Sequence, residues 1–186
     1  MTFGTNSSER ANGVLGRLGL TLATPTEIVE ARAIAARTVG PQVATTSALQ
    51  AIQDRTACST FVYRGTETEI SGVICIIPLG RAAQPILAAG DFDGRTPPLG
   101  MAARPGEPVV AVYGWGMAGT TFRGRAVAMA GVLSIHREIF DSVPMFSRAA
   151  TRGGERTLLG RMDGRPVPGP GGLVVCPAWN IQRKAA

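Results

Sequence analysis

The chain has 186 residues, of which 45% are hydrophobic and 17% charged, so it can bury a core of its own and carries no long disordered charged tract. Its net charge of +6 comes almost wholly from arginine, which suits an anionic ligand or partner but is explained equally well by a compositional bias of the source. No stretch approaches the ~18 continuous apolar residues of a membrane helix, and no apolar leader is present, so we expect a soluble protein of the cytoplasm without a membrane span.

The N-terminal part predicts a strand followed by two helices. Residues 1–17 open with a polar run, and we expect a flexible N-terminal tail there. The alternation LGLTLAT at 18–24 indicates a first strand. Thr24 and Glu27 form a capping box with a proline at the first helical position, so a helix begins here, and a weaker helix is expected over 45–55.

The middle of the chain predicts a hairpin and a long loop. The stretches CSTFVYRG (58–65) and ISGVICIIPL (70–79) read as two strands joined by a short polar link, with the second strand central in a sheet. Residues 80–107 are rich in Gly, Pro and Ala and are expected to form an insertion or lid loop, because connections of this length are usually functional or disordered.

The second half predicts alternating strands and helices. We expect a long strand over 108–118, a helix over 123–140, a strand over 143–151, a short helix over 153–162 and a last strand over 172–176. This order predicts one α/β (α+β) domain over 18–178, with a mixed sheet flanked by helices and a C-terminal tail over 179–186.

The stretch AGTTFRGRAVAMAGVL, which begins at Ala118, places an Arg-Gly-Arg turn where the long strand meets the next helix. The free N–H groups and positive dipole end at a helix start bind anions, and nearby arginines strengthen such a site. We therefore expect a phosphate-bearing ligand here. The alternative is a tight connection with arginines that face solvent.

The element order and the FRGRAVA stretch together resemble the GCN5-related N-acetyltransferase (GNAT) superfamily. Its signature R/Q-x-x-G-x-G/A is matched over 123–128 as R-x-x-A-x-A, and GERTLLGRMDGRPVPG is similar to the family's closing helix and strand. The resemblance covers residues 18–176 and implies a mostly antiparallel sheet with a V-shaped splay between strands four and five. Three positions depart from the family pattern: Ala126 replaces a signature glycine, and Gly160 and Arg165 stand where a tyrosine acid and an aromatic are expected.

The resemblance implies a function, a cofactor and site residues. The function is transfer of an acetyl or other acyl group from acetyl-CoA or another acyl-CoA to an amine or other nucleophile on a small molecule or peptide, in an acceptor pocket shaped by the 80–107 loop. The implied catalytic residues are Glu107, as a base acting through water, and Tyr113, for which a core or pocket-wall role is the alternative. Strand four would bind the pantetheine and the turn the phosphates, through Trp115, Gly116, Met117, Ala118, Arg123, Gly124, Arg125, Ala126, Val127 and Ala128.

Two alternative functions stay open. One is an acyltransferase whose donor is an acyl carrier protein. A basic cluster in the last third of the chain could receive a cofactor phosphate or the acidic surface of such a carrier, although a solvated face explains it at least as well. The cluster comprises Arg148, Arg152, Arg156, Arg161 and Arg165. The other is a catalytically inactive GNAT fold that binds a ligand or protein. Nucleic acid is disfavoured, because lysine is scarce and no aromatic residues interleave with these arginines.

The remaining chemistry-bearing residues predict structural roles. His136 lies several helical turns beyond the Arg-Gly-Arg turn and is expected to pack or face solvent rather than act as a base. Asp91 and Asp93 in GDFDG lack the other ligands of a calcium loop and are expected to shape a turn. The cysteines are widely spaced and are expected to be buried thiols without a disulfide or a metal: Cys58, Cys75 and Cys176.

Overall fold

The computed structural model describes residues 4–65, 68–169 and 171–181. Its strands are β1 (Gly4–Thr5), β2 (Leu20–Leu22), β3 (Thr60–Tyr63), β4 (Gly72–Leu79), β5 (Pro108–Val109), β6 (Ala111–Gly119), β7 (Met145–Arg148), β8 (Arg165–Pro166) and β9 (Leu173–Cys176). Its α-helices are α1 (Ser8–Gly16), α2 (Pro25–Thr38), α3 (Thr46–Thr56), α4 (Gln84–Ala88), α5 (Phe122–Ser134) and α6 (Arg152–Arg156). Helices α5 and α6 continue into the π-helical turns η3 (Ile135–Ile139) and η4 (Thr157–Arg161).

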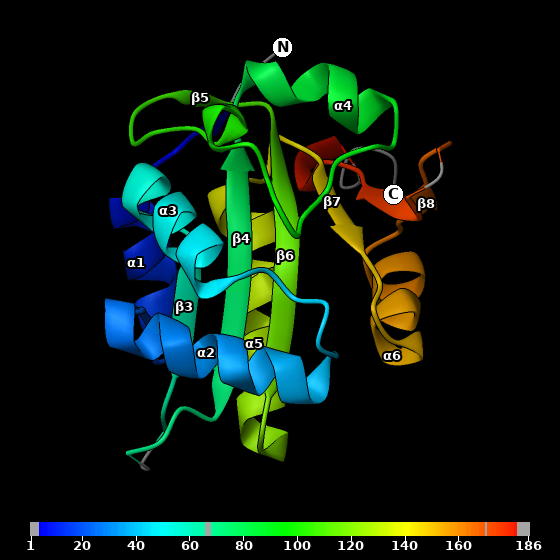
Figure 1. The fold of residues 1–186 in the computed structure, drawn as a ribbon. Helices are drawn as coiled ribbons and strands as arrows, with labels where there is room; N and C mark the ends of the chain where they lie inside the picture. Colours follow the sequence, from blue (N-terminus) through cyan, green and yellow to red (C-terminus); the bar gives the residue numbers. More distant parts are fainter. Residues whose placement is uncertain (1–3, 66–67, 170, 182–186) are drawn as a thin grey trace.

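These elements form a mixed α/β architecture around a seven-stranded sheet of order β2-β3-β4-β6-β7-β9-β8, with β1 and β5 paired separately. Neighbouring strands run antiparallel except β6 and β7, which are parallel. Helices α2 and α3 lie on one face of the sheet and α1 and α5 on the other (Figure 1). The predicted hairpin is confirmed as β3 and β4, and β4 is central as expected. Residues 66–67 of its link lie outside the described part of the chain.

The predicted capping box starts α2. The Thr24 side chain accepts a hydrogen bond from the Glu27 amide at 3.3 Å, and the Glu27 carboxylate accepts one from the Thr24 amide at 2.7 Å. These bonds satisfy two of the N–H groups that a helix start leaves free. The helix then buries one apolar stripe against the sheet, formed by Ile28, Ala31 and Ile34. The weaker predicted helix is also confirmed, as α3, with Thr45 as its N-cap.

The prediction of a flexible tail over 1–17 is wrong for residues 4–17, and residues 1–3 lie outside the described part of the chain. Residues 4–5 pair with β5, and α1 begins at Ser8 after the Ser7 side chain accepts a hydrogen bond from the Arg10 amide at 3.2 Å. Its buried side chains, Ala11, Val14 and Leu15, recur at helical spacing and join the main core cluster. Of the polar residues that suggested a tail, those of α1 lie mostly on its outer face. Asn6 is buried, and its amide donates to the carbonyls of Thr56 and Ala103, both at 2.9 Å.

The C-terminal boundary predicted at residue 178 also needs correction. The Arg137 guanidinium lies 4.2 Å from the centre of the Trp179 ring, and the Asn180 amide donates to the Asp141 carbonyl at 3.0 Å. Residues 179–181 therefore pack on the body of the protein, while 182–186 lie outside the described residues. The two-residue strand β8, which pairs with β9, was not expected from the sequence.

Residues 80–107 form a packed insertion between β4 and β5. Phe92 is fully buried, and its ring centre lies 4.7 Å from that of Tyr113 on the sheet. The Met101 carbonyl accepts a hydrogen bond from Gly80, and Ala102 bridges to Leu79. Asp93 shapes a turn as predicted, because its carboxylate accepts the Arg95 amide at 2.9 Å. No described helix is long and apolar enough to cross a bilayer.

Helix α5 is held against β4 by direct backbone contact. A Cβ on Gly124 would overlap the carbonyl oxygen of Ser71, and a Cβ on Gly72 would lie 2.6 Å from the carbonyl oxygen of Gly124. About two turns further on, a Cβ on Gly131 would lie 2.7 Å from the Leu20 side chain. Glycine is therefore required for packing where α5 contacts the sheet, because a side chain there would push the helix away from the sheet.

We expect Gly124→Ala to lower the free energy of unfolding by about 2 kcal/mol or more, because the obstructing atoms are backbone and cannot rotate away. The matched control is Gly13→Ala in α1, where a Cβ would meet nothing within 4 Å. That change should leave stability within about 1 kcal/mol of the wild type or raise it, since alanine favours helices. Urea unfolding of both variants measures the difference. Equal stabilities would contradict the packing role of Gly124.

Candidate functional site

The parallel pairing of β6 and β7 is short. Only Val112, Tyr113 and Gly114 of β6 pair with β7, and β7 then leans away from β6 (Figure 1). On its other edge β6 pairs with β4 along its whole length. From residue 115 to residue 119, β6 therefore has one edge without a strand partner in the described sheet. Arg125 Nη1 donates to the Gly119 carbonyl at 3.5 Å, and the other backbone N–H and C=O groups on that edge are available to a ligand.

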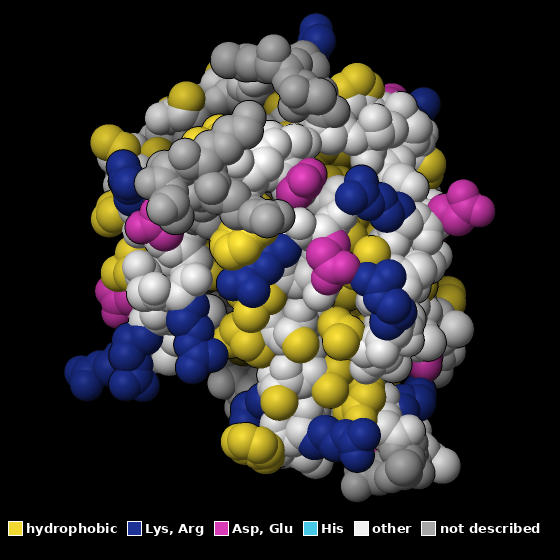
Figure 2. Space-filling model, turned by 180° about the vertical axis from the view of Figure 1, so that it is seen from behind, with side chains coloured by type: hydrophobic (Ala, Val, Ile, Leu, Met, Phe, Trp, Pro, Cys, Tyr) yellow, Lys and Arg dark blue, Asp and Glu magenta, His cyan; other side chains and the backbone are white. Residues whose placement is uncertain are grey.

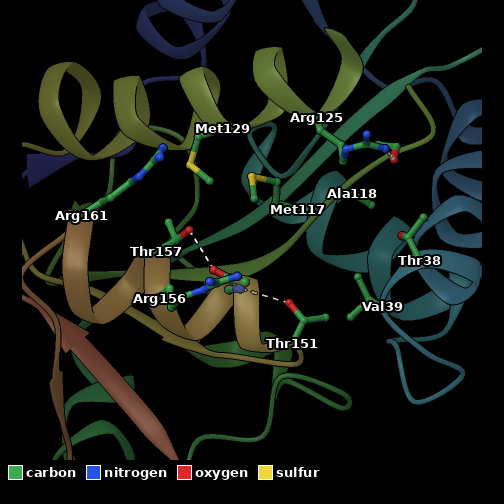
Figure 3. A pocket seen from close by; sticks show the side chains of 13 residues that line it. Thr38, Val39, Met117, Ala118, Arg125, Met129, Thr151, Arg156, Thr157 and Arg161 are labelled. Atoms are coloured by element: carbon green, nitrogen blue, oxygen red, sulfur yellow. Dashed lines mark hydrogen bonds between the residues drawn. The ribbon is translucent and has the colours of Figure 1, made fainter. Parts of the chain in front are cut away.

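A cavity of about 670 Å³ lies beside this unpaired edge (Figure 3). Residues from four elements line it: Thr38 and Val39 at the end of α2, Met117, Ala118 and Gly119 of β6, Arg125 and Met129 of α5, and Thr151, Gly153, Gly154, Arg156, Thr157 and Arg161 around α6. Its three arginines come from opposite sides, with Arg125 on α5 and Arg156 and Arg161 on the α6–η4 helix. None of the three belongs to an ion pair described for the chain, which are Arg17–Glu138, Arg64–Glu27 and Arg95–Asp93.

A second cavity, of about 170 Å³, adjoins the first where β6 and β7 separate. Its lining reaches Gly114 and Ser147, the last residue pair of the two strands. The two cavities share Val39, Met117, Met129, Thr151, Gly154 and Thr157. They therefore form one space that is wide and arginine-lined at the outer end and narrow at the inner end.

Strand β6 carries a β-bulge at the wall of this space. Cys75 pairs with Gly116 whereas Ile76 pairs with Gly114, so Trp115 is the extra residue. The Trp115 indole N–H donates to the Gly94 carbonyl, which fixes the ring. Four residues predicted to bind the cofactor, Trp115 to Ala118, line one or more of the cavities beside β6.

The other predicted cofactor residues, 123–128, lie within the first turns of α5 rather than in a loop. The Gly124 amide donates to the N-cap hydroxyl of Thr121 at 2.9 Å, and the Arg125 amide donates to the Thr121 carbonyl at 3.0 Å. Gly124 and Ala128 are buried in the fold, Val127 packs on the main core, and Arg123 and Ala126 are exposed. Among these six residues, Arg125 alone lines the large cavity.

The two predicted catalytic residues lie away from the cavity walls. The Glu107 carboxylate accepts the Arg104 amide at 2.7 Å at the exposed start of β5. Tyr113 is buried against Phe92, and this burial raises the pKa of its phenol to about 12. Neither residue lines the two cavities, nor does any residue of the 80–107 insertion.

The predicted basic cluster divides into separate parts. Arg156 and Arg161 face the large cavity, while Arg152 lines a separate hollow on the other side of α6, together with Glu155 and Leu159. Arg148 lies on the sheet, and its Nε is buried without a hydrogen-bond partner in the described chain. On the face that carries α5, arginines lie among exposed hydrophobic side chains (Figure 2).

Sequence reasoning missed several cavity residues. Thr38 and Val39 come from the last turn of α2, and Met129 comes from the second turn of α5. Thr151 caps α6 by accepting the Gly154 amide at 3.0 Å. The one available signal was the Thr-x-x-Gly start of a helix beside a predicted strand end, which marks a second helix N-terminus at the same space.

The cysteines and histidine have structural roles. Cys58 and Cys176 are buried, Cys75 is partly buried, and all three are free thiols as expected. The described residues contain no group of three or more metal-ligating side chains. His136 is buried, and its Nε2 donates to the Pro177 carbonyl at 2.9 Å, which agrees with the predicted packing role.

Burial lowers the pKa of His136, so the native state resists protonation where the unfolded chain accepts a proton. We therefore expect the free energy of unfolding to fall between about pH 7.5 and about pH 5.5, by at most about 1.4 kcal/mol per pH unit. His136→Gln, which keeps a donor for Pro177, should remove this slope. Urea unfolding at several pH values tests this, and a wild-type stability that does not change over this window would contradict it.

Comparison with known proteins does not identify the family of this chain, so the GNAT resemblance stays a prediction from the sequence. No protein-family model, no curated protein and no solved structure gives a significant match. The function proposed below therefore rests on the residues of the cavity and on the strands and helices that place them.

Proposed function

We propose that the protein binds acyl-CoA in the arginine-lined space beside β6 and transfers its acyl group to an amine or another nucleophile. The observation that carries this proposal is the unpaired edge of β6 at residues 115–119, which faces a cavity with three arginines outside ion pairs. Such a site suits an extended ligand that has amides along its length and phosphates at one end.

The architecture supports the GNAT resemblance. From β2 to β9 the order of elements contains the predicted one, with the short strands β5 and β8 added, and the parallel strand pair β6 and β7 stands where the resemblance expects strands four and five. The separation of these strands beyond Gly114 corresponds to the family's V-shaped splay. These features are consistent with a divergent member of the superfamily.

The residues present fit an acyl-CoA. The pantetheine arm contains two amides, and the N–H and C=O groups of 115–119 can bond to it as an added strand would. The arginines offer charge-assisted hydrogen bonds to phosphates from two sides of the large cavity. The phosphate site therefore involves Arg125, Arg156 and Arg161 more than the backbone of 124–128.

The protein's own groups would promote the reaction by holding the thioester in position for attack. No Asp, Glu, His, Tyr or Lys lines either cavity. Burial raises the pKa of the one thiol in the inner lining, Cys75, to about 11, so neither cavity supplies an effective side-chain acid or base at neutral pH. A bound acyl-CoA supplies a thioester that an amine can attack directly, and backbone N–H groups at the Trp115 bulge can polarise its carbonyl. The amine would have to arrive neutral. As its nitrogen bonds to the acyl carbon, the C–S bond breaks, CoA leaves as a thiolate, and the proton from the nitrogen passes to solvent.

The lack of an effective side-chain acid or base in the cavity walls favours a second candidate function. In it, the protein binds acyl-CoA but catalyses no reaction. The cavity walls offer ligand contacts but no effective proton-transfer side chain. A thioester-cleavage assay with a panel of amines distinguishes the two functions. Cleavage that depends on one amine favours the transferase, whereas tight binding without cleavage favours the binding module.

We expect Arg125→Ala to weaken acetyl-CoA binding about tenfold or more, because a charge-assisted hydrogen bond to a phosphate contributes about 1.5–3 kcal/mol. The matched control is Arg123→Ala, since Arg123 is exposed two residues earlier on the same helix and does not line the cavity. That change should alter affinity by less than about threefold. Calorimetric titration measures both, and affinity should fall as salt is raised.

Three results would contradict the proposed site. The first is that wild-type protein binds neither acetyl-CoA nor CoA. The second is an equal loss in the Arg123 and Arg125 variants, which would place the phosphates at the helix start and not in the cavity. The third is that Arg156→Ala, on the opposite wall, leaves affinity unchanged.

A further inference from the structure

The inner cavity has an apolar wall built from four elements. Its hydrophobic lining includes Ile76 of β4, Met129 and Val132 of α5, Met145 of β7, Leu158 of η4 and Met162. Of these, Ile76, Met145, Leu158 and Met162 are buried. Methionine side chains are flexible and fill irregular space, so this wall can adjust to an apolar ligand group.

The hydroxyls in this lining are already used within the protein. Ser147 donates to the Gly114 carbonyl at 2.8 Å, and Thr157 donates to the Gly153 carbonyl at 3.0 Å. The Thr151 hydroxyl accepts the Gly154 amide, as part of the α6 cap. A ligand at the inner end therefore meets mostly apolar surface, whereas a ligand at the outer end meets arginines.

We propose that the inner cavity binds an apolar acyl chain longer than acetyl, attached to the thioester whose phosphates occupy the outer cavity. This inference rests on the proposed function and adds the class of acyl group to it. An acetyl group would leave most of the methionine-lined space unfilled, whereas each additional buried methylene gains favourable transfer from water. The shared lining of the two cavities places chain and phosphates on one ligand.

Arg148 is the one charged residue in the inner lining, and its buried Nε lacks a hydrogen-bond partner in the described chain. It suggests a different acyl group, one that ends in a carboxylate. The apolar residues outnumber it and come from all sides of the cavity, so an apolar chain is the better match. The experiment includes the acidic chain as a competing outcome.

The test is calorimetric titration of wild-type protein with CoA, acetyl-CoA, butanoyl-CoA and hexanoyl-CoA, without an acceptor. We expect the affinity to rise about fourfold for each added methylene until the cavity is full. Pentanoyl-CoA is compared with glutaryl-CoA, which has the same number of acyl carbons but ends in a carboxylate. S-hexanoyl phosphopantetheine, which lacks the nucleotide, tests whether the chain is recognised when the donor resembles an acyl carrier protein.

A filling variant locates the chain. Val132→Phe adds a ring at the inner wall and should abolish the gain from acetyl to hexanoyl while leaving affinity for CoA within about threefold. The control is Val29→Phe on α2, where the wild-type side chain is 55% exposed and lines neither cavity. It should keep the full dependence on chain length.

The outcomes separate the two proposals. If CoA binds but its thioesters bind equally tightly, or if glutaryl-CoA binds more tightly than pentanoyl-CoA, the apolar-chain inference is overturned and the proposed function stands. If neither CoA nor any thioester binds, both are overturned. Chain-dependent binding that Val132→Phe removes and Val29→Phe preserves supports the inference. So does binding of S-hexanoyl phosphopantetheine, because the chain is then recognised without the nucleotide.

Discussion

The site depends on the early end of the pairing between β6 and β7. After Gly114, the strands cannot rejoin, because β7 is fully paired with β9 on its other edge and the α6–η4 helix follows it directly. Strand β6 is equally fixed, since all of it pairs with β4. Apart from the Gly119 carbonyl, which accepts from Arg125, the backbone groups of 115–119 on the open edge must therefore bond to water or to a ligand, since leaving them unpaired is costly. A ligand with amides can bond to several of these backbone groups at once, so this edge of β6 is a candidate binding site.

Close glycine contacts decide which side chains face that edge. Gly72 and Gly124 bring α5 onto β4, and a Cβ on Gly119 would lie 2.6 Å from the Arg125 amide nitrogen. This seating directs Arg125 and Met129 toward the cavity and buries Gly124. The glycine of the FRGRAVA stretch thus has a sufficient packing reason. A glycine between arginines at a helix start does not by itself indicate a phosphate-binding loop, because close packing of a helix on a sheet also requires glycine.

The sequence was informative where a local pattern determines structure. The Thr24 capping box, the apolar run of β4 and the long strand that becomes β6 can all be predicted, because cap chemistry and burial act within a few residues. Helix α1 was missed because its apolar positions are few and its other residues polar, and only contact with η3 and β2 explains it. The sequence predicts the β6 wall of the cavity and Arg125 on α5. The α2 wall, with Thr38 and Val39, depends on strand order and crossing geometry, which no local pattern near these two residues encodes.

The two ends of the space attract a ligand by different physics. Arg125, Arg156 and Arg161 are exposed, so their attraction for phosphates acts at long range and is screened by salt. The inner wall acts only on contact, through burial of apolar surface, and salt changes this little. Affinity for the CoA part of the ligand therefore comes from the arginines, and selection among acyl chains comes from the apolar inner wall. Because no effective acid or base side chain lines either end, the rate of any transfer depends on how firmly these two attractions hold the thioester at the Trp115 bulge.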